Sequence, residues 1–241
     1  MSKVMIATIA ALGLSLAQPA AATIYLATYT GHFIGGAASS QDVTGLFGAP
    51  RTSLDGTAYK AVFRIDDALP GASVYVPIDP YHDGTQIQGG TNYQSNVLPV
   101  SATITVNSRT QSFLGAASSV AIQIHHNYDE ILDYVNGGRG SLFAQVLQFE
   151  PVEFLSSPDL RTPLEYDVPN SASSASISFS IYQNDPTTYD YAFGYGAIDH
   201  LSITAGSAVP EPAGWALLIA GVGLVGVALR RRGAIDLPVT A

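Results

Sequence analysis

Short segments of alternating apolar and polar residues recur along most of this chain. In residues 176–181, Ile177, Phe179 and Ile181 alternate with serines. A period of two puts the two sets on opposite faces of a β-strand. Asp-Gly, Pro-Gly, Gly-Gly and Asn-Gly pairs between the segments favour turns, and no long amphipathic helix pattern interrupts them. The pattern predicts an all-β body.

The expected strands are short and numerous, which favours an antiparallel β-sandwich, jelly-roll-like in arrangement, with a closed barrel as the alternative. Residues 129–135 are expected to form one or two helical turns instead of a strand. The expected strands are residues 23–29, 58–66, 73–78, 101–106, 120–126, 142–149, 176–182 and 197–203.

The composition of the body, residues 23–208, limits what it can bind. It is long enough to bury a core of its own, and the chain contains no cysteine, which excludes disulfides and thiolate zinc sites. The body carries 17 acidic and 6 basic residues, a charge near −11 with neutral histidines. A nucleic-acid partner is excluded because phosphate binding needs a positive surface.

The C-terminal region has a different pattern. Pro210, Glu211 and Pro212 precede an uncharged apolar run, residues 213–229, which is followed by Arg230, Arg231 and Arg232. A helix of about 17 residues spans roughly 25 Å, near the lower limit for crossing a membrane. Trp215 is placed as an interfacial anchor, and the arginines favour a cytoplasmic end. We expect a transmembrane helix at 213–229; a buried core helix is the alternative.

These elements, in this order, resemble the PEP-CTERM sorting signal of Gram-negative bacteria over residues 209–232. The resemblance implies recognition by exosortase, cleavage near Pro210-Glu211-Pro212, and release or transfer to the cell surface or extracellular polymer. Residues 233–241 would form a short cytoplasmic tail.

The N-terminus has the features of a secretory signal peptide, expected at residues 1–22 with a signal helix. Lys3 provides a positive start, Val4 to Leu16 form an apolar stretch, and Ala20 and Ala22 fit an A-x-A cleavage site. An uncleaved anchor is the alternative. Both termini predict the same topology, with an inner-membrane anchor and a periplasmic body before processing.

The loop at residues 41–48 resembles an opening found in many PEP-CTERM proteins, D-x-T-G-x-F-G. Physically, Asp42 can cap a turn, Gly45 and Gly48 permit positive φ, and Phe47 would enter the core. We expect a structural loop; a ligand loop is the alternative.

No arrangement of catalytic residues stands out in the sequence. The H-E-x-x-H and G-x-S-x-G motifs are absent, and adjacent strand residues His125 and His126 would point to opposite faces. Glu150 and Glu153 would also lie on opposite faces. The other histidines, His32, His82 and His200, have no partner in a motif.

Glu165 and Asp167 would share a face, but such pairs are common in an acidic β protein. A glycosidase, which needs two carboxylates about 5–9.5 Å apart, remains the catalytic alternative. We expect the body to have no catalytic residues.

Calcium is the metal that this chain is best suited to bind, although we expect no cofactor. Asp79 and Asp83 flank a turn, and Asp129, Glu130 and Asp133 form a second acidic group. Calcium prefers hard oxygen ligands. The competing interpretation of both groups is solvated acidic turns, which we favour.

An aromatic segment near the C-terminal end of the body alternates strictly. Tyr189, Tyr191, Phe193 and Tyr195 would share one face of a strand, with Tyr182 nearby. Exposed rings would stack on sugars, whereas buried rings would be core. We expect burial.

These observations predict a non-catalytic exported protein that is sorted to the envelope or extracellular polymer matrix. Its expected partners are exosortase, the export machinery, the membrane before processing, and extracellular polysaccharide. The alternatives are a secreted polysaccharide-acting hydrolase and a permanently anchored single-pass protein.

Overall fold

A computed structural model describes residues 24–35, 40–69, 73–75, 78–79, 82–90, 94–124, 128–149, 151, 153–170, 174–182 and 191–206. The described strands belong to one compact unit, Thr23–Ser207. The expected signal peptide, including Ala20 and Ala22, lies outside the described residues. So does the sorting segment with Pro210, Glu211, Pro212, Trp215, Arg230, Arg231 and Arg232.

All regular structure in the described residues is β-strand. The strands are β1 (Ile24–Phe33), β2 (Gln41–Asp42), β3 (Thr52–Ser53), β4 (Ala58–Asp66), β5 (Ser73–Tyr75), β6 (Ile78–Asp79), β7 (His82–Gly89), β8 (Val100–Val106), β9 (Arg109–Phe113), β10 (Ala116–Ile124), β11 (Tyr128–Gly137), β12 (Gly140–Phe149), β13 (Leu164–Asp167), β14 (Ser174–Tyr182) and β15 (Tyr191–Ala205). The described part of the chain contains no helix that is long and apolar enough to span a bilayer.

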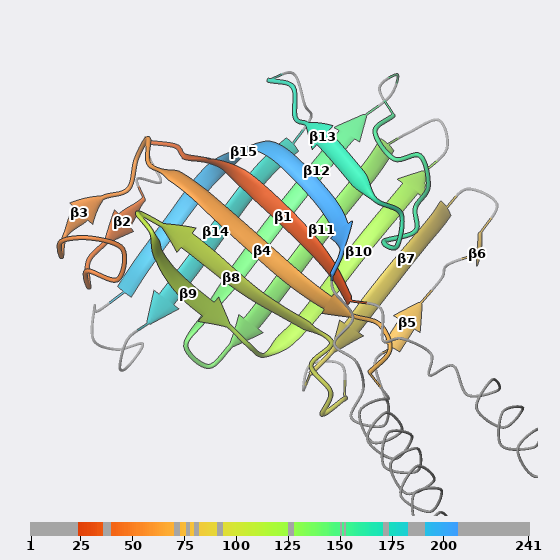
Figure 1. Cartoon of the computed structure of the whole chain (residues 1–241), viewed down its shortest axis with the longest axis horizontal. Coiled ribbons are helices and arrows are strands. Elements are labelled where there is room, and N and C mark those ends of the chain that lie inside the picture. The colour runs from red at the N-terminus through yellow and green to blue at the C-terminus, as the bar shows by residue number, and fades with distance from the viewer. Residues whose placement is uncertain are drawn as a thin grey trace, which may run out of the picture. The chain divides into compact units, whose positions relative to one another are not determined.

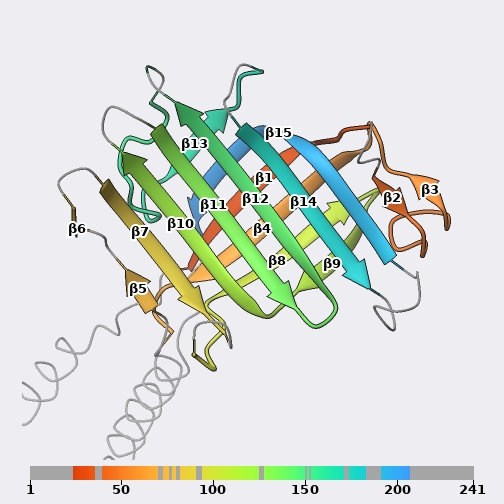
Figure 2. The same cartoon turned by 180° about the vertical axis from the view of Figure 1, so that it is seen from behind.

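The strands form a single antiparallel sheet that curls over itself into two layers (Figures 1 and 2). Its order is β5-β7-β10-β11-β12-β14-β15-β1-β4-β8-β9. The first layer contains β7, β10, β11, β12 and β14, and the second contains β1, β4, β8 and β9; their strands cross in the two views. The predicted all-β antiparallel class is confirmed, and the two facing layers are sandwich-like.

Strand β15 joins the two layers. Its first part, Tyr191–Ala197, pairs with β14, whereas Gly196–Ala205 pairs with β1. The register against β1 shifts between Thr30 and Gly31, which leaves Asp199 as an extra residue. Such a bulge bends a strand and allows it to pass from one layer to the other.

Gly31 allows β1, β4 and β15 to pack closely where β15 passes from one layer to the other. Tyr59 from β4 donates its hydroxyl hydrogen to the carbonyl of Ala197, with 2.7 Å between the oxygens. A Cβ on Gly31 would lie 2.0 Å from that same carbonyl oxygen and 2.7 Å from the Tyr59 hydroxyl. A side chain at position 31 would therefore displace one of the two groups.

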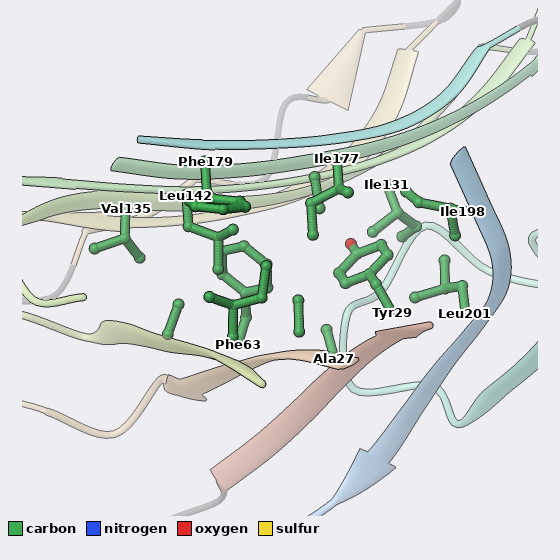
Figure 3. Packing of buried hydrophobic residues seen from close by; sticks show 14 of the residues in the cluster. Ala27, Tyr29, Phe63, Ile131, Val135, Leu142, Ile177, Phe179, Ile198 and Leu201 are labelled. Carbon is green, nitrogen blue, oxygen red and sulfur yellow. The ribbon is translucent and has the colours of Figure 1, made fainter. Parts of the chain in front are cut away.

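The core lies between the layers (Figure 3). Phe179, Leu142 and Ile177 project from the first layer toward Phe63 and Tyr29 of the second. The side chains of Phe63 and Leu142 are completely buried. Edge-to-face ring pairs such as Tyr29–Phe63, with centroids 5.7 Å apart, fill the space between the layers.

The expectation of helical turns at 129–135 is wrong, because these residues lie in the middle of strand β11. Asp129 and Asp133 alternate inward with Ile131 and Val135. Because two of the four inward residues are acids, the apolar residues of this strand do not recur at every second position, and the strand pattern is hard to recognise in the sequence. Most of the other expected strands are present, and β4 has the predicted bounds.

Candidate functional site

The outward surface of the first layer, with its continuation onto the start of β15, is rich in large apolar side chains. We call it the aromatic face. Tyr182, Tyr195 and Phe149 are 39%, 41% and 49% exposed, high values for such residues. The face comprises Val120, Ile122, Tyr128, Leu132, Tyr134, Phe143, Leu147, Phe149, Tyr182, Tyr191, Phe193 and Tyr195, interspersed with serines and glutamines.

The expectation that the Tyr191-Phe193-Tyr195 strip is buried is wrong. The residues between them, Ala192 and Gly194, point inward. A Cβ on Gly194 would lie 2.3 Å from a ring carbon of Phe179 and 2.7 Å from one of Phe33. The inward side of β15 therefore accommodates rings from neighbouring strands, and its own rings point outward. Tyr189 lies outside the described residues.

The strand register aligns several rings across the aromatic face. Tyr134 pairs with Phe143, Phe143 with Ser178, and Ser178 with Tyr195. Because neighbouring strands lie about 4.8 Å apart, Phe143 and Tyr195 are separated by roughly 10 Å along this row. Rings at this interval can stack on every second unit of an extended polymer.

A shallow groove of about 480 Å³ lies on the aromatic face over β7, β10, β11 and β12. Glu130 is only 9% exposed in it and accepts a hydrogen bond from Gln145, and Gln86 donates to the Ser118 hydroxyl at 3.1 Å. Apolar walls with a few polar groups are typical of ligand sites. The groove is lined by Gln86, Ser118, Val120, Ile122, Glu130, Leu132, Tyr134 and Phe143.

The outward surface of the second layer is polar, and we call it the hydroxyl face. Register pairs Ser202 with Thr28, Thr28 with Val62, and Val62 with Thr103. The rest of this face carries Thr30, Lys60, Arg64, Ser101, Thr105, Thr110, Ser112 and His200.

Glu165 and Asp167 share a face of β13, as predicted, and both bond to His200 of β15. The Asp167 carboxylate lies 2.7 Å from Nδ1 and the Glu165 carboxylate 3.0 Å from Nε2. Hydrogen bonding to Asp167 first, and then to Glu165, raises the pKa of His200 above its usual value. Both carboxylates are well exposed, and each contacts the imidazole through one of its oxygens. A second, separate pair joins His32 Nδ1 to Asp199 at 3.0 Å.

The Asp42 loop is structural, as expected. The buried Asp42 carboxylate accepts hydrogen bonds from the backbone N–H groups of Gly45, Leu46 and Phe47, at 2.8, 2.9 and 2.7 Å. Phe47 is fully buried and packs edge-to-face on Phe179.

Of the two glycines singled out in this loop, only one adopts the left-handed region. Gly45 has a φ of 81°, whereas Gly48 does not have a positive φ. The loop carbonyls are also satisfied: Arg109 donates to the carbonyls of Gly45 and Gly48 at 3.0 and 3.1 Å.

The favoured interpretation of Asp129, Glu130 and Asp133 as a solvated acidic turn is wrong, because all three are buried in strand β11, and their side chains do not converge. Glu130 points outward, and the other two point inward. Asp129 accepts hydrogen bonds from the N–H groups of Phe154 and Leu155, both at 2.8 Å. These bonds attach the loop before β13 to the core.

Asp133 is a buried carboxyl group in the apolar core. The Tyr29 hydroxyl donates to its Oδ2 at 2.6 Å. Burial raises the pKa of Asp133 to about 6, although the neighbouring Ser119 and Tyr29 hydroxyls favour the ionised form. Burial also raises the pKa of Tyr29 well above its usual value.

For several of the remaining candidates, the side chains lie outside the part of the chain that the structure describes. Asp79 lies in β6 and Asp83 in β7, and these strands pair with each other; their side chains lie outside the description. The same holds for the side chain of His82, and for His125, His126 and Glu150 altogether. Across the described ranges, no three His, Asp or Glu side chains are placed to hold a metal ion.

Several residues of the aromatic face, among them Tyr134 and Phe143, are not evident from the sequence pattern alone. Phe143 lies on a strand whose inward residues are also mostly apolar, whereas the inward residues of the strand that carries Tyr134 include Asp129 and Asp133. Alternation alone therefore does not show that either ring points outward. The sequence signal that could have found these rings is the turn at Gly138 and Arg139. A hairpin of β11 and β12 around this turn brings Tyr134 opposite Phe143.

The comparisons with known proteins identify one segment of the chain. A family model, the PEP-CTERM protein-sorting motif, matches residues 208–232. Neither the curated proteins nor the solved structures provide a match. The motif implies export, processing by exosortase, and a surface or secreted location. The chain therefore carries a PEP-CTERM sorting signal at its C-terminal end and has the character of an exosortase substrate.

Proposed function

We propose that this protein is a non-catalytic component of the cell envelope or extracellular polymer matrix, and that its body contacts neutral glycan through the aromatic face. The observation that carries the proposal is the outward row of Tyr134, Phe143 and Tyr195. A protein that functions without contacts on this layer would gain nothing from outward rings, and exposed apolar patches mark interaction sites.

The polar groups between the rings favour a sugar over an apolar partner. Serines 174, 176, 178 and 180 line β14 beside the rings, and Glu130, Gln145 and Gln86 lie in or beside the groove. Aromatic rings bind the apolar face of a sugar while amides and carboxylates bind its hydroxyls.

The charge of the body favours a neutral glycan. A body near −11 repels polyanions, so a neutral polymer is the better occupant of a broad face. Rings about 10 Å apart suit every second unit of an extended chain.

The binding test uses the full chain and affinity electrophoresis through gels that contain dextran, β-glucan or xylan. We expect retardation by at least one neutral polymer, and we expect Phe143→Ala with Tyr195→Ala to weaken it about tenfold or more, since buried rings dominate contact energies. Val62→Thr on the hydroxyl face is the matched control and leaves retardation unchanged. Unretarded wild-type protein, or a double variant that is retarded like wild type, would refute glycan contact.

The proposed path to the matrix begins with an inner-membrane anchor, with the body in the periplasm, and ends with removal of the C-terminal helix. The sorting motif at 208–232 supports this order. Mass spectrometry of the mature C-terminus in the native host tests it. A chain that still contained Arg230, Arg231 and Arg232 at the cell surface would contradict processing and favour a permanently anchored protein.

A further inference from the structure

A second concave site lies at one end of the body, apart from the groove on the aromatic face. It has a volume of about 490 Å³, within the range of small-molecule sites. The β9–β10 turn, the β11–β12 hairpin, the end of β14 and Leu46 of the Asp42 loop surround it. We call it the end pocket.

Glycines shape the end pocket in two ways. A Cβ on Gly115 would lie 2.1 Å from the Asn136 carbonyl oxygen, and one on Gly137 would lie 2.1 Å from that of Leu114. These two glycines therefore let the turn and the hairpin touch, which closes one side. Gly138 is different, because a Cβ there would meet nothing within 4 Å. The hairpin tip leaves open space beside Arg139.

The lining of the end pocket combines one cation with hydrogen-bonding and apolar groups. Arg139 is exposed at the hairpin tip, and its backbone carbonyl accepts a hydrogen bond from Tyr182 N–H at 2.9 Å, which ties the hairpin to β14. Gln111 adds an amide, and Phe113 and Leu46 add apolar surface. No acidic residue is among the described residues that line it.

This chemistry selects a small anion with hydroxyl groups. A guanidinium binds a carboxylate through two parallel hydrogen bonds, and the Tyr182 ring, which is 39% exposed, offers a stacking surface. A single arginine in a body near −11 is suited to one carboxylate and not to a polyanion.

We propose that the end pocket binds a uronic acid, a sugar that carries one carboxylate, as a free monosaccharide or at the end of a glycan. The carboxylate pairs with Arg139, the sugar hydroxyls bond to Gln111, and the ring packs on Tyr182. The end pocket shares Tyr182 with the edge of the aromatic face, but it does not include Tyr134, Phe143 or Tyr195, the row proposed to contact neutral glycan.

The test measures binding of glucuronate and galacturonate to the full chain by calorimetry, with glucose and galactose as neutral counterparts. We expect saturable binding of at least one uronate and at least tenfold weaker binding of its neutral counterpart. Arg139→Gln is expected to weaken uronate binding tenfold to a hundredfold, since a charged hydrogen-bonded pair is lost. Lys60→Gln removes a cation from the hydroxyl face and leaves binding unchanged.

A second variant blocks the site without removing charge. Gly138→Leu places a side chain in open space at the hairpin and is expected to abolish uronate binding while the unfolding transition stays the same. Gly48→Ala, also at a loop glycine without a positive φ, is its control.

Undetectable binding of both uronates to wild-type protein would overturn the proposal, and so would equal affinity in Arg139→Gln. The two proposals fail separately. Phe143→Ala with Tyr195→Ala is expected to retain uronate binding, and Arg139→Gln is expected to retain gel retardation by neutral polymer.

Discussion

The two outward faces of this body are built on the same curled sheet, yet they differ in character. The hydroxyl face carries threonines, serines and a few charges, which suit contact with water. The aromatic face carries rings in rows, and three of its rings are 39–49% exposed. Folding requires a covered apolar face only between the layers, and the proposed glycan contact would account for the outward rings.

The largest expected effect on stability comes from a substitution in the core between the two layers. Phe179→Ala should lower the free energy of unfolding by about 3–5 kcal/mol, because it empties the space beside Phe33 and Phe47. Ser178→Ala, the outward neighbour, should change it by about 0.5 kcal/mol or less. Urea denaturation measures both, and similar losses at the two positions would break the distinction between inward and outward residues.

Asp133 is an exception on the inward side of the aromatic layer. Its pKa of about 6 lies above the ordinary 3.8, so the folded state resists ionisation. The contribution of Asp133 to stability is therefore greatest below the ordinary pKa of 3.8 and is lost as pH rises through about 6, where the buried carboxyl loses its proton. Asp133→Asn keeps an acceptor for the Tyr29 hydroxyl and should stabilise the fold on the order of 1–3 kcal/mol at pH 8.

The difference in the free energy of unfolding between Asp133→Asn and the wild-type protein should become small toward pH 4. Thermal unfolding across this pH range measures it. A variant that is less stable than wild type at pH 8 would mean that the ionised carboxylate is compensated in the core.

The outward rings should contribute little to stability. Tyr195→Ser and Phe149→Ser should each cost about 1 kcal/mol or less, since large parts of both rings already contact water. Binding of a hydrophobic dye should fall in parallel. If either variant lowered the free energy of unfolding as much as Phe179→Ala does, these rings would be needed for folding. The contrast between the two outward faces would then disappear.

The smallest effect is expected beside the hydroxyl face, at His200. Its raised pKa means that its interactions with Asp167 and Glu165 stabilise the fold below the ordinary histidine pKa and are lost as pH rises through the folded value. Because the site is exposed, His200→Gln should cost less than about 1 kcal/mol near pH 6 and nothing at pH 9. A loss that persisted undiminished at pH 9 would exclude the charge of His200 as its cause.

The sequence alone determined the features that depend on local chemistry. The sorting motif is readable because its elements stand in a fixed order, and a family model matches the same residues. The Asp42 loop was predictable because a carboxylate that caps the next few N–H groups acts within one turn. Strand β4 was predictable because its alternation is uninterrupted.

The tertiary structure decided which side of each strand became the core. Alternation defines two sets of side chains, but only the partner layer determines which set is buried. In β15 the small set, Ala192 and Gly194, turned inward because Phe33 and Phe179 already occupy that space. In β11 the core covers Asp133, although the residues beside it on the inward face, Ile131 and Val135, are apolar. The end pocket likewise depends on Gly115, in the β9–β10 turn, meeting Asn136 near the end of β11, a contact between separate segments that no local pattern encodes.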